Sequence, residues 1–453
     1  MNSIYLRASG LFHRFIQSPL LRRIVKNSGY LFSATGIAAF MSMLQGILTA
    51  RLLGPSDFGT LGAITVFTST INRFASFRMN EMVVRYVGHY EENGDSLKAA
   101  AVFKSASYLE MSGSIISFIL IMVLAPLGAT YIGHDSSLTP LFRIYGTIVL
   151  ANLISESAMG LMQISDSFRT IAIITALQST VTLILIIVAY FSGSGLMAIL
   201  LAYMWGKIIG ALGITGAALR QAGKIWGRSW WRTPISLLSQ QRRSILTFAF
   251  STNISSTISL VAKDSEVLWV SGFLGTTQAG YYKLALALSN LLQLPVSPLP
   301  KATFPELSRE IARNSWDNVR YILRQGSRLA ATYSVPMTIG LFIFGPWLIS
   351  TLYGSNYLPA YPALVVLLIG YTFVNIFYWN RVALLSLGRP IFPTIVNFVG
   401  MIFKISGIFL LVPQFGYLAF AALLTAYYIF TVGVAAARVL FDVRKQSVEV
   451  NKE

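Results

Sequence analysis

The sequence contains no cysteine, and only 11% of its 453 residues are charged. Without a thiol, the chain can form neither a disulfide framework nor a thiolate metal site. Typical soluble domains contain about 25% charged residues, whereas this chain is 55% hydrophobic and has a mean hydropathy of +0.63. The composition therefore excludes a water-soluble globule and indicates a polytopic membrane protein.

Histidine and acidic residues are also scarce. The histidines His13, His89 and His134 are far apart and show no ligand spacing, so we predict no metal site. We find no Gly-rich phosphate loop and no Ser/His/Asp set, and we predict no catalytic residues. The 17 Asp and Glu stand against 35 Lys and Arg, a formal net charge of +18. In a soluble chain such an excess would suggest nucleic acid, so its distribution along the chain decides its meaning.

Long apolar windows predict an all-α protein with about twelve membrane-spanning helices, because each span needs about 20 mostly apolar residues. The expected spans are 29–50, 57–78, 105–127, 140–163, 169–191, 195–220, 244–272, 279–301, 328–350, 360–386, 391–412 and 416–438. Pro295, Pro298 and Pro300 predict a broken or kinked eighth span. Gly206, Gly210 and Gly213 favour close helix packing in the sixth.

The positive residues predict the orientation of these spans, because Lys and Arg are retained in cytoplasmic loops. With both termini cytoplasmic, 27 of the 35 Lys and Arg lie in cytoplasmic segments and one, Arg51, lies in an outer loop. This asymmetry accounts for most of the +18 without nucleic acid. We therefore predict a multi-pass membrane protein with both termini cytoplasmic.

Two basic segments outside the spans are expected to rest on membrane phospholipids. Residues 1–28 form an amphipathic cytoplasmic arm, and residues 221–243 form a basic cytoplasmic linker with Trp226, Trp230 and Trp231 among Lys and Arg. Both compositions suit the surface of an anionic inner leaflet, and generic interfacial anchoring is the favoured interpretation. Residues 441–453 form a cytoplasmic tail.

An internal repeat divides the chain into two halves. The segment Leu53-Gly54-Pro55-Ser56-Asp57-Phe58-Gly59 is followed 221 residues later by Leu274-Gly275-Thr276-Thr277-Gln278-Ala279-Gly280, and each precedes the second span of a six-span set. An even number of spans per half gives both halves the same orientation. The repeat predicts two parallel six-helix lobes, at 29–220 and 244–440.

These residues resemble the polysaccharide-transporter family of lipid-linked oligosaccharide flippases, the O-antigen flippase type, within the superfamily that includes multidrug and toxin extruders. The matching features are Ala50 to Gly59, the run from Asp264 to Gly275, Gly280-Tyr281-Tyr282, and Phe304 to Ser308. The resemblance implies an alternating-access carrier with a central cavity. It also implies a bacterial cytoplasmic (inner) membrane. The implied cargo is an undecaprenyl-pyrophosphate-linked glycan, moved from the cytoplasmic to the periplasmic leaflet for surface polysaccharides such as lipopolysaccharide or exopolysaccharide.

Eleven ionisable residues fall inside the predicted spans. Leaving all of them in lipid would cost on the order of 30 kcal/mol, so most must face protein or water. The acids are the candidate ion-coupling residues Asp264, Glu266, Glu110 and Glu156. The cations are the candidate substrate-binding residues Arg73, Lys207, Lys283, Lys404, Lys263, Arg381 and Arg143. A net positive interior suits an anionic lipid-linked glycan.

Several alternatives stay open at this stage. Each cation could instead pair with an acid or snorkel; snorkelling is favoured for Arg143, and Lys263 lies one turn from Glu266. Asp264 is the first choice for binding a coupling ion, H⁺ or Na⁺, and we expect no other cofactor. A multidrug exporter of the same fold and a membrane glycan polymerase or ligase are the rival functions, and polymerase and assembly proteins are possible partners. The short outer loops, which hold only Arg51, Asp57 and Asp135, disfavour an enzyme.

Overall fold

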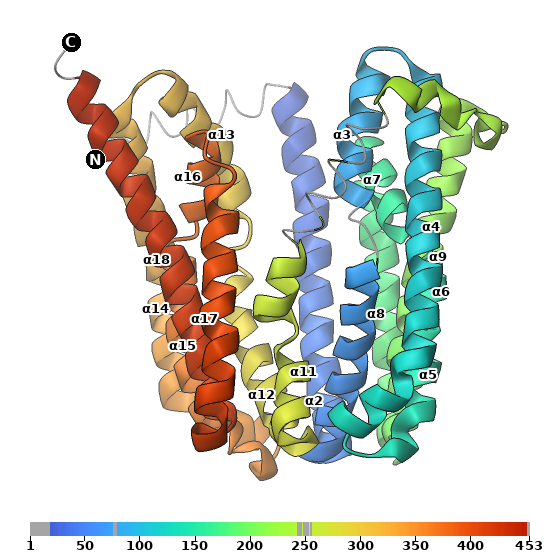
Figure 1. Cartoon of the computed structure of the whole chain (residues 1–453), viewed down its shortest axis with the longest axis vertical. Helices are drawn as coiled ribbons and strands as arrows, with labels where there is room; N and C mark the ends of the chain where they lie inside the picture. The colour runs from blue at the N-terminus through green and yellow to red at the C-terminus, as the bar shows by residue number, and fades with distance from the viewer. Residues whose placement is uncertain (1–18, 76–78, 242–246, 248–252, 254–255, 451–453) are drawn as a thin grey trace. The chain divides into compact units, whose positions relative to one another are not determined.

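A computed structural model describes residues 19–75, 79–241, 247, 253 and 256–450 (Figure 1). Within these residues the chain forms helices joined by short turns and contains no strand. The helices of the first half are α2 Pro19–Ala75, α3 Met79–Glu92, α4 Ser96–Leu127, α5 Thr139–Gly146, α6 Ile148–Ala151, α7 Ser155–Ile164, α8 Phe168–Phe191 and α9 Leu196–Trp226. Those of the second half are α11 Glu266–Leu274, α12 Thr276–Asn290, α13 Leu299–Ala312, α14 Trp316–Leu352, α15 Ala360–Ile376, α16 Asn380–Ser386, α17 Phe392–Phe415 and α18 Tyr417–Val450.

Shorter helical pieces join these helices. They are the π-helices η1 Gly128–Ile132 and η5 Leu260–Asp264, and the 3₁₀ turns η2 Ser136–Leu138, η3 Trp230–Arg232, η4 Ile235–Gln241, η6 Leu291–Gln293 and η7 Ser355–Tyr357. The fold is therefore all-α, as the apolar windows predicted.

Nine helical stretches of the described chain are long and apolar enough to cross a membrane. One of them, Gly36–Ala75, holds the first two predicted spans, so the nine account for ten of the twelve. The predicted span 244–272 is described at residues 247, 253 and 256–272, where the chain is helical from 256, passes through η5 and continues into α11. The predicted span 140–163 is helical but interrupted, because α5, α6 and α7 follow one another with short breaks.

The eighth predicted span is broken where the prolines lie. Helix α12 ends at Asn290, and helical structure resumes in α13 at Leu299. A proline cannot donate a backbone hydrogen bond, so carbonyls in the preceding turn lose their helical partners. The Leu292 carbonyl is satisfied by the buried Asn375 amide, at 2.8 Å. The predicted break is confirmed, and a polar side chain of α15 stabilises it.

The two copies of the repeat share an unusual backbone conformation. Gly54 has φ 70° and ψ 175°, and Gly275 has φ 93° and ψ 169°. This region of backbone space is essentially restricted to glycine. Gly54 divides α2 into two helices, and Gly275 separates α11 from α12, so each glycine ends one helix and begins the next. The repeat inferred from sequence is thus present in the backbone.

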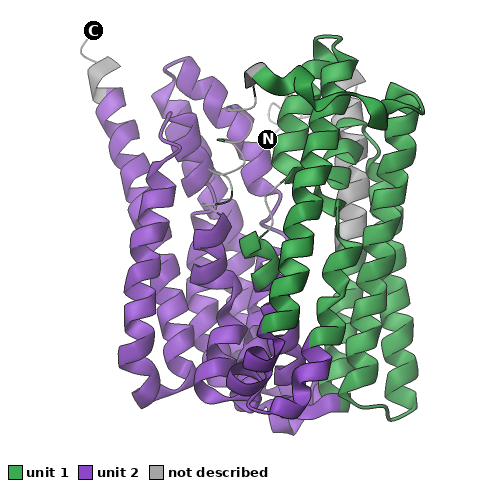
Figure 2. Ribbon diagram, turned by 45° about the vertical axis from the view of Figure 1, so that its right-hand side comes forward, with its two compact units in different colours: residues 1–52, 71–123, 143–253 green, residues 53–70, 124–142, 254–453 purple. Residues whose placement is uncertain are grey.

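The chain packs as two compact units (Figure 2). Unit 1 comprises residues 1–52, 71–123 and 143–253, and unit 2 comprises residues 53–70, 124–142 and 254–453. Two first-half segments, 53–70 and 124–142, therefore pack within the same unit as the second half. The lobe boundaries predicted from the repeat, 29–220 and 244–440, stay a prediction, because each unit is defined by which residues pack together and unit 2 contains segments of both halves.

Each unit has its own apolar core. In unit 1, α3, α4, α7 and α9 enclose a cluster that includes Met79, Val83, Phe103, Leu161 and Ile214. In unit 2, α13, α14, α16 and α18 enclose a cluster that includes Leu307, Trp316, Leu323, Trp379 and Val439.

The glycines of α9 allow its close approach to α8. A Cβ atom at Gly206 would overlap Thr182, and one at Gly210 would overlap Gln178. The predicted packing role of these small residues is confirmed.

Candidate functional site

Lys404 and Glu266 form a buried ion pair in unit 2. Their side chains are 2% and 1% exposed, and the Lys404 ammonium contacts a Glu266 carboxylate oxygen directly. Lys404 also donates to the Ala262 carbonyl, and the buried Tyr282 hydroxyl donates to the second Glu266 oxygen at 2.6 Å. Both charges are therefore paired and hydrogen-bonded, which a buried ion pair requires.

The sequence left open whether Glu266 pairs with Lys263, and in the structure Glu266 pairs with Lys404 instead. A spacing of three residues brings side chains together only on a regular α-helix. Here the chain forms η5 and a turn at Ser265, whose N–H donates to the Leu260 carbonyl at 3.0 Å. The π-helical turn changes the angular relation of the two residues, and Glu266 points to Lys404 of α17 instead. Lys263 and Asp264 are both exposed.

Asp264, the preferred ion-coupling candidate, lies near this pair. Its charge interacts electrostatically with Lys404 and with the largely buried tyrosines Tyr371, Tyr427 and Tyr428. π-Helical turns within α-helices are frequent at functional sites. Asp264 and Glu266 therefore lie on either side of the turn at Ser265, and both interact with Lys404.

Lys283 of α12 has an unusual environment for a membrane cation. Its ammonium donates to the Phe58 carbonyl at 3.1 Å and lies 3.9 Å from the centre of the Phe58 ring. Within the described part of the chain it forms no ion pair. The lysine is thus held by a backbone dipole and an aromatic face, an arrangement that stabilises a cation without neutralising it.

Glu110 of α4, a candidate ion-coupling residue, caps a helix in unit 1. Its carboxylate accepts from the Glu156 N–H at 2.8 Å, and from the Ser157 N–H at 2.9 Å and hydroxyl at 2.6 Å. These donors belong to the first turn of α7, where backbone N–H groups have no helical acceptors. The geometry gives the buried Glu110 a structural role that sequence spacing did not reveal. Glu156 itself is exposed and makes a further interaction.

The other candidate cations are exposed on their helices. Lys207 of α9 lies 5.8 Å from the Tyr145 ring centre. Arg143 lies on α5 and Arg381 on α16, and Arg73 lies in the last turn of α2, where it makes a further interaction. Across the ranges that the structure describes, no ion pair is formed by Lys207, Lys263, Lys283, Arg143 or Arg381. Glu110 contacts backbone and serine donors of α7 and forms no ion pair with a described cation, so these five cations have no described acid partner.

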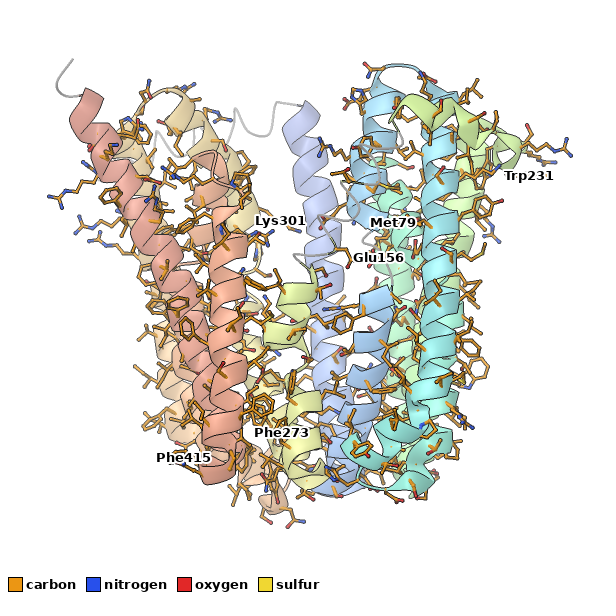
Figure 3. All side chains as sticks on the ribbon, in the orientation of Figure 1. Met79, Glu156, Trp231, Phe273, Lys301 and Phe415 are labelled. Atoms are coloured by element: carbon orange, nitrogen blue, oxygen red, sulfur yellow. The ribbon has the colours of Figure 1, made fainter. Side chains whose placement is uncertain are left out.

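The basic linker is attached to unit 1 by aromatic residues. Trp226 and Trp230 pack against Phe103, and the Trp226 indole donates to Glu91 at 2.5 Å. Trp231 is 55% exposed, with the Arg232 guanidinium 4.8 Å from its ring (Figure 3). The exposed tryptophan and arginine have the chemistry of an interfacial anchor. Part of the predicted linker and most of the N-terminal arm lie outside the described residues.

A model of the family described as "Polysaccharide biosynthesis protein" matches residues 48–362, more than half of the chain. The chain belongs to the polysaccharide biosynthesis protein family. The resemblance inferred from the repeat and its motifs is confirmed. A relative named "Inner membrane protein YghQ" from Escherichia coli K12 is 22% identical over 340 residues, which cover 75% of this chain and 95% of that protein.

Solved structures show that this family member has the fold of known membrane transporters. An inward-facing multidrug-resistance transporter of the MATE family has a TM-score of 0.72 at 13% identity, covering 90% of this chain and 95% of that one. The lipid II flippase MurJ in an inward closed conformation has a TM-score of 0.68 at 15% identity, covering 92% and 90%. Family and fold agree with the predicted transporter class and not with the enzyme alternative.

Three partners of the charged residues in this family member were not identified from its sequence. Tyr282 and the Ala262 carbonyl complete the Lys404–Glu266 site, and Phe58 holds Lys283. Tyr282 and Phe58 lie within the segments that carry the resemblance, but no spacing rule connects Lys283 with Phe58, which lies 225 positions earlier in the chain. No described group of three or more His, Cys, Asp or Glu residues is placed to hold a metal ion.

Proposed function

We propose that this protein is an alternating-access flippase that moves an undecaprenyl-pyrophosphate-linked oligosaccharide or polysaccharide repeat unit from the cytoplasmic to the periplasmic leaflet. It would act in the inner membrane, with both termini cytoplasmic, in the synthesis of a surface glycan such as O-antigen or exopolysaccharide. Membership of a polysaccharide biosynthesis family supports the pathway. The observation that supports an anionic cargo is the set of membrane cations that form no ion pair within the described residues.

The energetics of these cations support an anionic cargo. A charged side chain in the middle of a span costs about 2.5–3.5 kcal/mol on insertion scales. Lys207 lies near the centre of α9 and forms no ion pair within the described chain. A water-filled path that binds pyrophosphate and acidic sugars would stabilise such residues, because oxyanions form charge-assisted hydrogen bonds with ammonium and guanidinium groups.

The multidrug exporter is the second candidate, since the fold is shared with a multidrug transporter. Many exported drugs are organic cations, which a net positive interior would repel. The charge distribution therefore favours the flippase.

Ion coupling is part of the proposal. Ionisable residues inside membrane spans are rare and mark ion and proton pathways. Asp264 is exposed, makes a further interaction and lies in the field of Lys404, whereas Glu266 and Glu110 are buried. Asp264 is therefore the preferred coupling residue, ahead of Glu266, Glu156 and Glu110.

The test is complementation of a deletion strain. Loss of the protein should cause lipid-linked glycan to accumulate in the inner leaflet while drug resistance is unchanged. Lys207→Glu and Arg73→Glu should reduce surface glycan at least tenfold, with Lys207→Arg largely active and Lys224→Glu, at the end of α9, as the control. Normal surface glycan from both charge reversals at normal protein abundance would contradict the cationic-path proposal, and a changed drug resistance with normal glycan would support the exporter.

A further inference from the structure

The two copies of the repeat pack against each other within unit 2. A Cβ atom at Gly59 would overlap the Thr276 carbonyl, and one at Gly280 would overlap the Pro55 carbonyl. Gly280 is the repeat equivalent of Gly59, and Thr276 is that of Pro55, since both pairs are 221 residues apart. The contact is therefore reciprocal, as in an interface between two symmetry-related copies. Only glycine allows the two backbones to come this close.

Polar contacts surround this glycine crossing. The Ser56 and Thr276 hydroxyl oxygens are 3.2 Å apart. Lys283 is the repeat equivalent of Gly62, and its aliphatic chain occupies the space that a Cβ atom at Gly62 would need. This position lets the ammonium reach the Phe58 carbonyl and ring. Lys283 thus joins the two repeat copies. The backbones of the two copies are equivalent here, but one copy has a lysine where the other has Gly62.

A second first-half segment makes similar contacts in unit 2. The Ser271 hydroxyl donates to the Ile132 carbonyl at 2.7 Å, and His134 Nε2 lies 2.7 Å from the Ser271 carbonyl. The edge of the Tyr357 ring also meets Phe58, with ring centres 6.0 Å apart. The first-half segments 53–70 and 124–142 are therefore joined to the second half by several independent interactions.

All of these segments belong to one membrane face. Gly54 follows the first predicted span and Gly275 follows the seventh. The chain has therefore crossed the membrane an odd number of times before each turn, and both turns lie on the face opposite to the N-terminus. Residues 128–138 follow the third span, and Gly354 and Tyr357 follow the ninth. With cytoplasmic termini, this face is periplasmic.

We propose that the crossing of Gly59 and Gly280 is the closed periplasmic gate of the carrier and that Lys283 is its latch. The inference rests on the proposed flippase function, because only a carrier must open this face in each cycle. The crossing itself consists of glycines, backbone carbonyls and the Ser56 and Thr276 hydroxyls, and water can take over the hydrogen bonds of such polar groups when the two copies separate. The latch bonds a backbone carbonyl and a ring, and it leaves no acid unpaired when it is released.

A reversible cross-link tests the gate. The chain has no cysteine, so the variant Ser56→Cys/Thr276→Cys has no competing thiols. Oxidation should cross-link the pair and reduce glycan transport at least tenfold, and reduction should restore it. Thr338→Cys/Thr372→Cys, whose parent hydroxyl oxygens are 2.5 Å apart within the second half, is the matched control and should transport in both states. Undiminished transport by the fully cross-linked gate variant would overturn the proposal.

A labelling experiment tests the closed contact without assuming transport. A single Thr276→Cys should react slowly with an impermeant maleimide added from outside, and adding Gly59→Ala should raise the rate at least threefold by wedging the crossing apart. Lys283→Met should raise it as well, whereas Lys283→Arg should have a smaller effect. Equal rates in all variants would refute the gate. If the reduced cysteine variant and the wild type both fail to restore glycan while labelling behaves as expected, the flippase proposal fails and the closure stands.

Discussion

Removing one member of the Lys404–Glu266 pair should destabilise the protein far more than removing both. Lys404→Met leaves a buried carboxylate with only the Tyr282 hydroxyl, and Glu266→Leu leaves a buried ammonium with only the Ala262 carbonyl among its described partners. Breaking a buried pair in this way costs about 3–5 kcal/mol, whereas replacing both charges with apolar groups is often close to neutral.

The structure sets the order of these variants. Each single substitution should lower the free energy of unfolding by about 3–5 kcal/mol. The double variant should lie much closer to the wild type, which gives a coupling energy of at least about 2 kcal/mol. Reversible unfolding in mixed detergent micelles measures all four proteins. Lys207→Met, at an exposed site where the described chain offers no ion pair, should change stability by only about 0.5 kcal/mol.

Additive single and double effects would refute the assignment of this pair as a coupled buried unit. Transport by the stable double variant then separates two roles for Lys404. If the double variant folds but does not transport, the pair takes part in transport, through the predicted cargo contact of Lys404 or the predicted ion coupling of Glu266; if it transports normally, the role of both residues is structural.

Three further outcomes follow from the geometry. Glu110→Ala should destabilise the protein by about 1–3 kcal/mol, because two N–H groups of α7 lose their acceptor, and unfolding equal to the wild type would contradict the cap. Gly54→Ala and Gly275→Ala should each cost about 1–3 kcal/mol through backbone strain; a neutral effect in the same unfolding assay would show that the turns relax. Hydrogen bonds from Lys98 lower the pKa of Asp95 below its ordinary 3.8, so its stabilisation of the start of α4 is present at neutral pH and lost as the pH falls below that value. The protection of amides in the first turn of α4 against hydrogen exchange should fall over that range, and unchanged protection at neutral pH in Asp95→Ala would contradict the cap.

Much of the fold could be predicted from the sequence because it depends on local properties. Apolar length located the spans, and the glycine-containing repeat located the turns at Gly54 and Gly275, whose backbone conformations are restricted to glycine. The prolines after Asn290 placed the break between α12 and α13. Each of these features follows from the steric and hydrogen-bonding properties of single residues.

The partners of the charged residues were less accessible. The sequence left a Lys263–Glu266 pairing open, which would need a regular helix, but η5 intervenes and Glu266 meets Lys404, 138 residues away. Glu110 stays a predicted ion-coupling residue, and its contacts with the first turn of α7 could not be foreseen, because the apolar window did not separate that helix from its neighbours. A count of charges predicts how many partners are needed, whereas the choice of partner depends on tertiary packing.

The central claim is that the protein moves an anionic lipid-linked glycan across the membrane. The direct measurement uses purified protein in liposomes with a fluorescent polyprenyl-pyrophosphate glycan and a membrane-impermeant quencher. The proposal predicts quenching of more than half of the probe, against about half in protein-free vesicles, and loss of this activity in Lys207→Glu but not in Lys224→Glu. Quenching that is the same with and without the protein would contradict it.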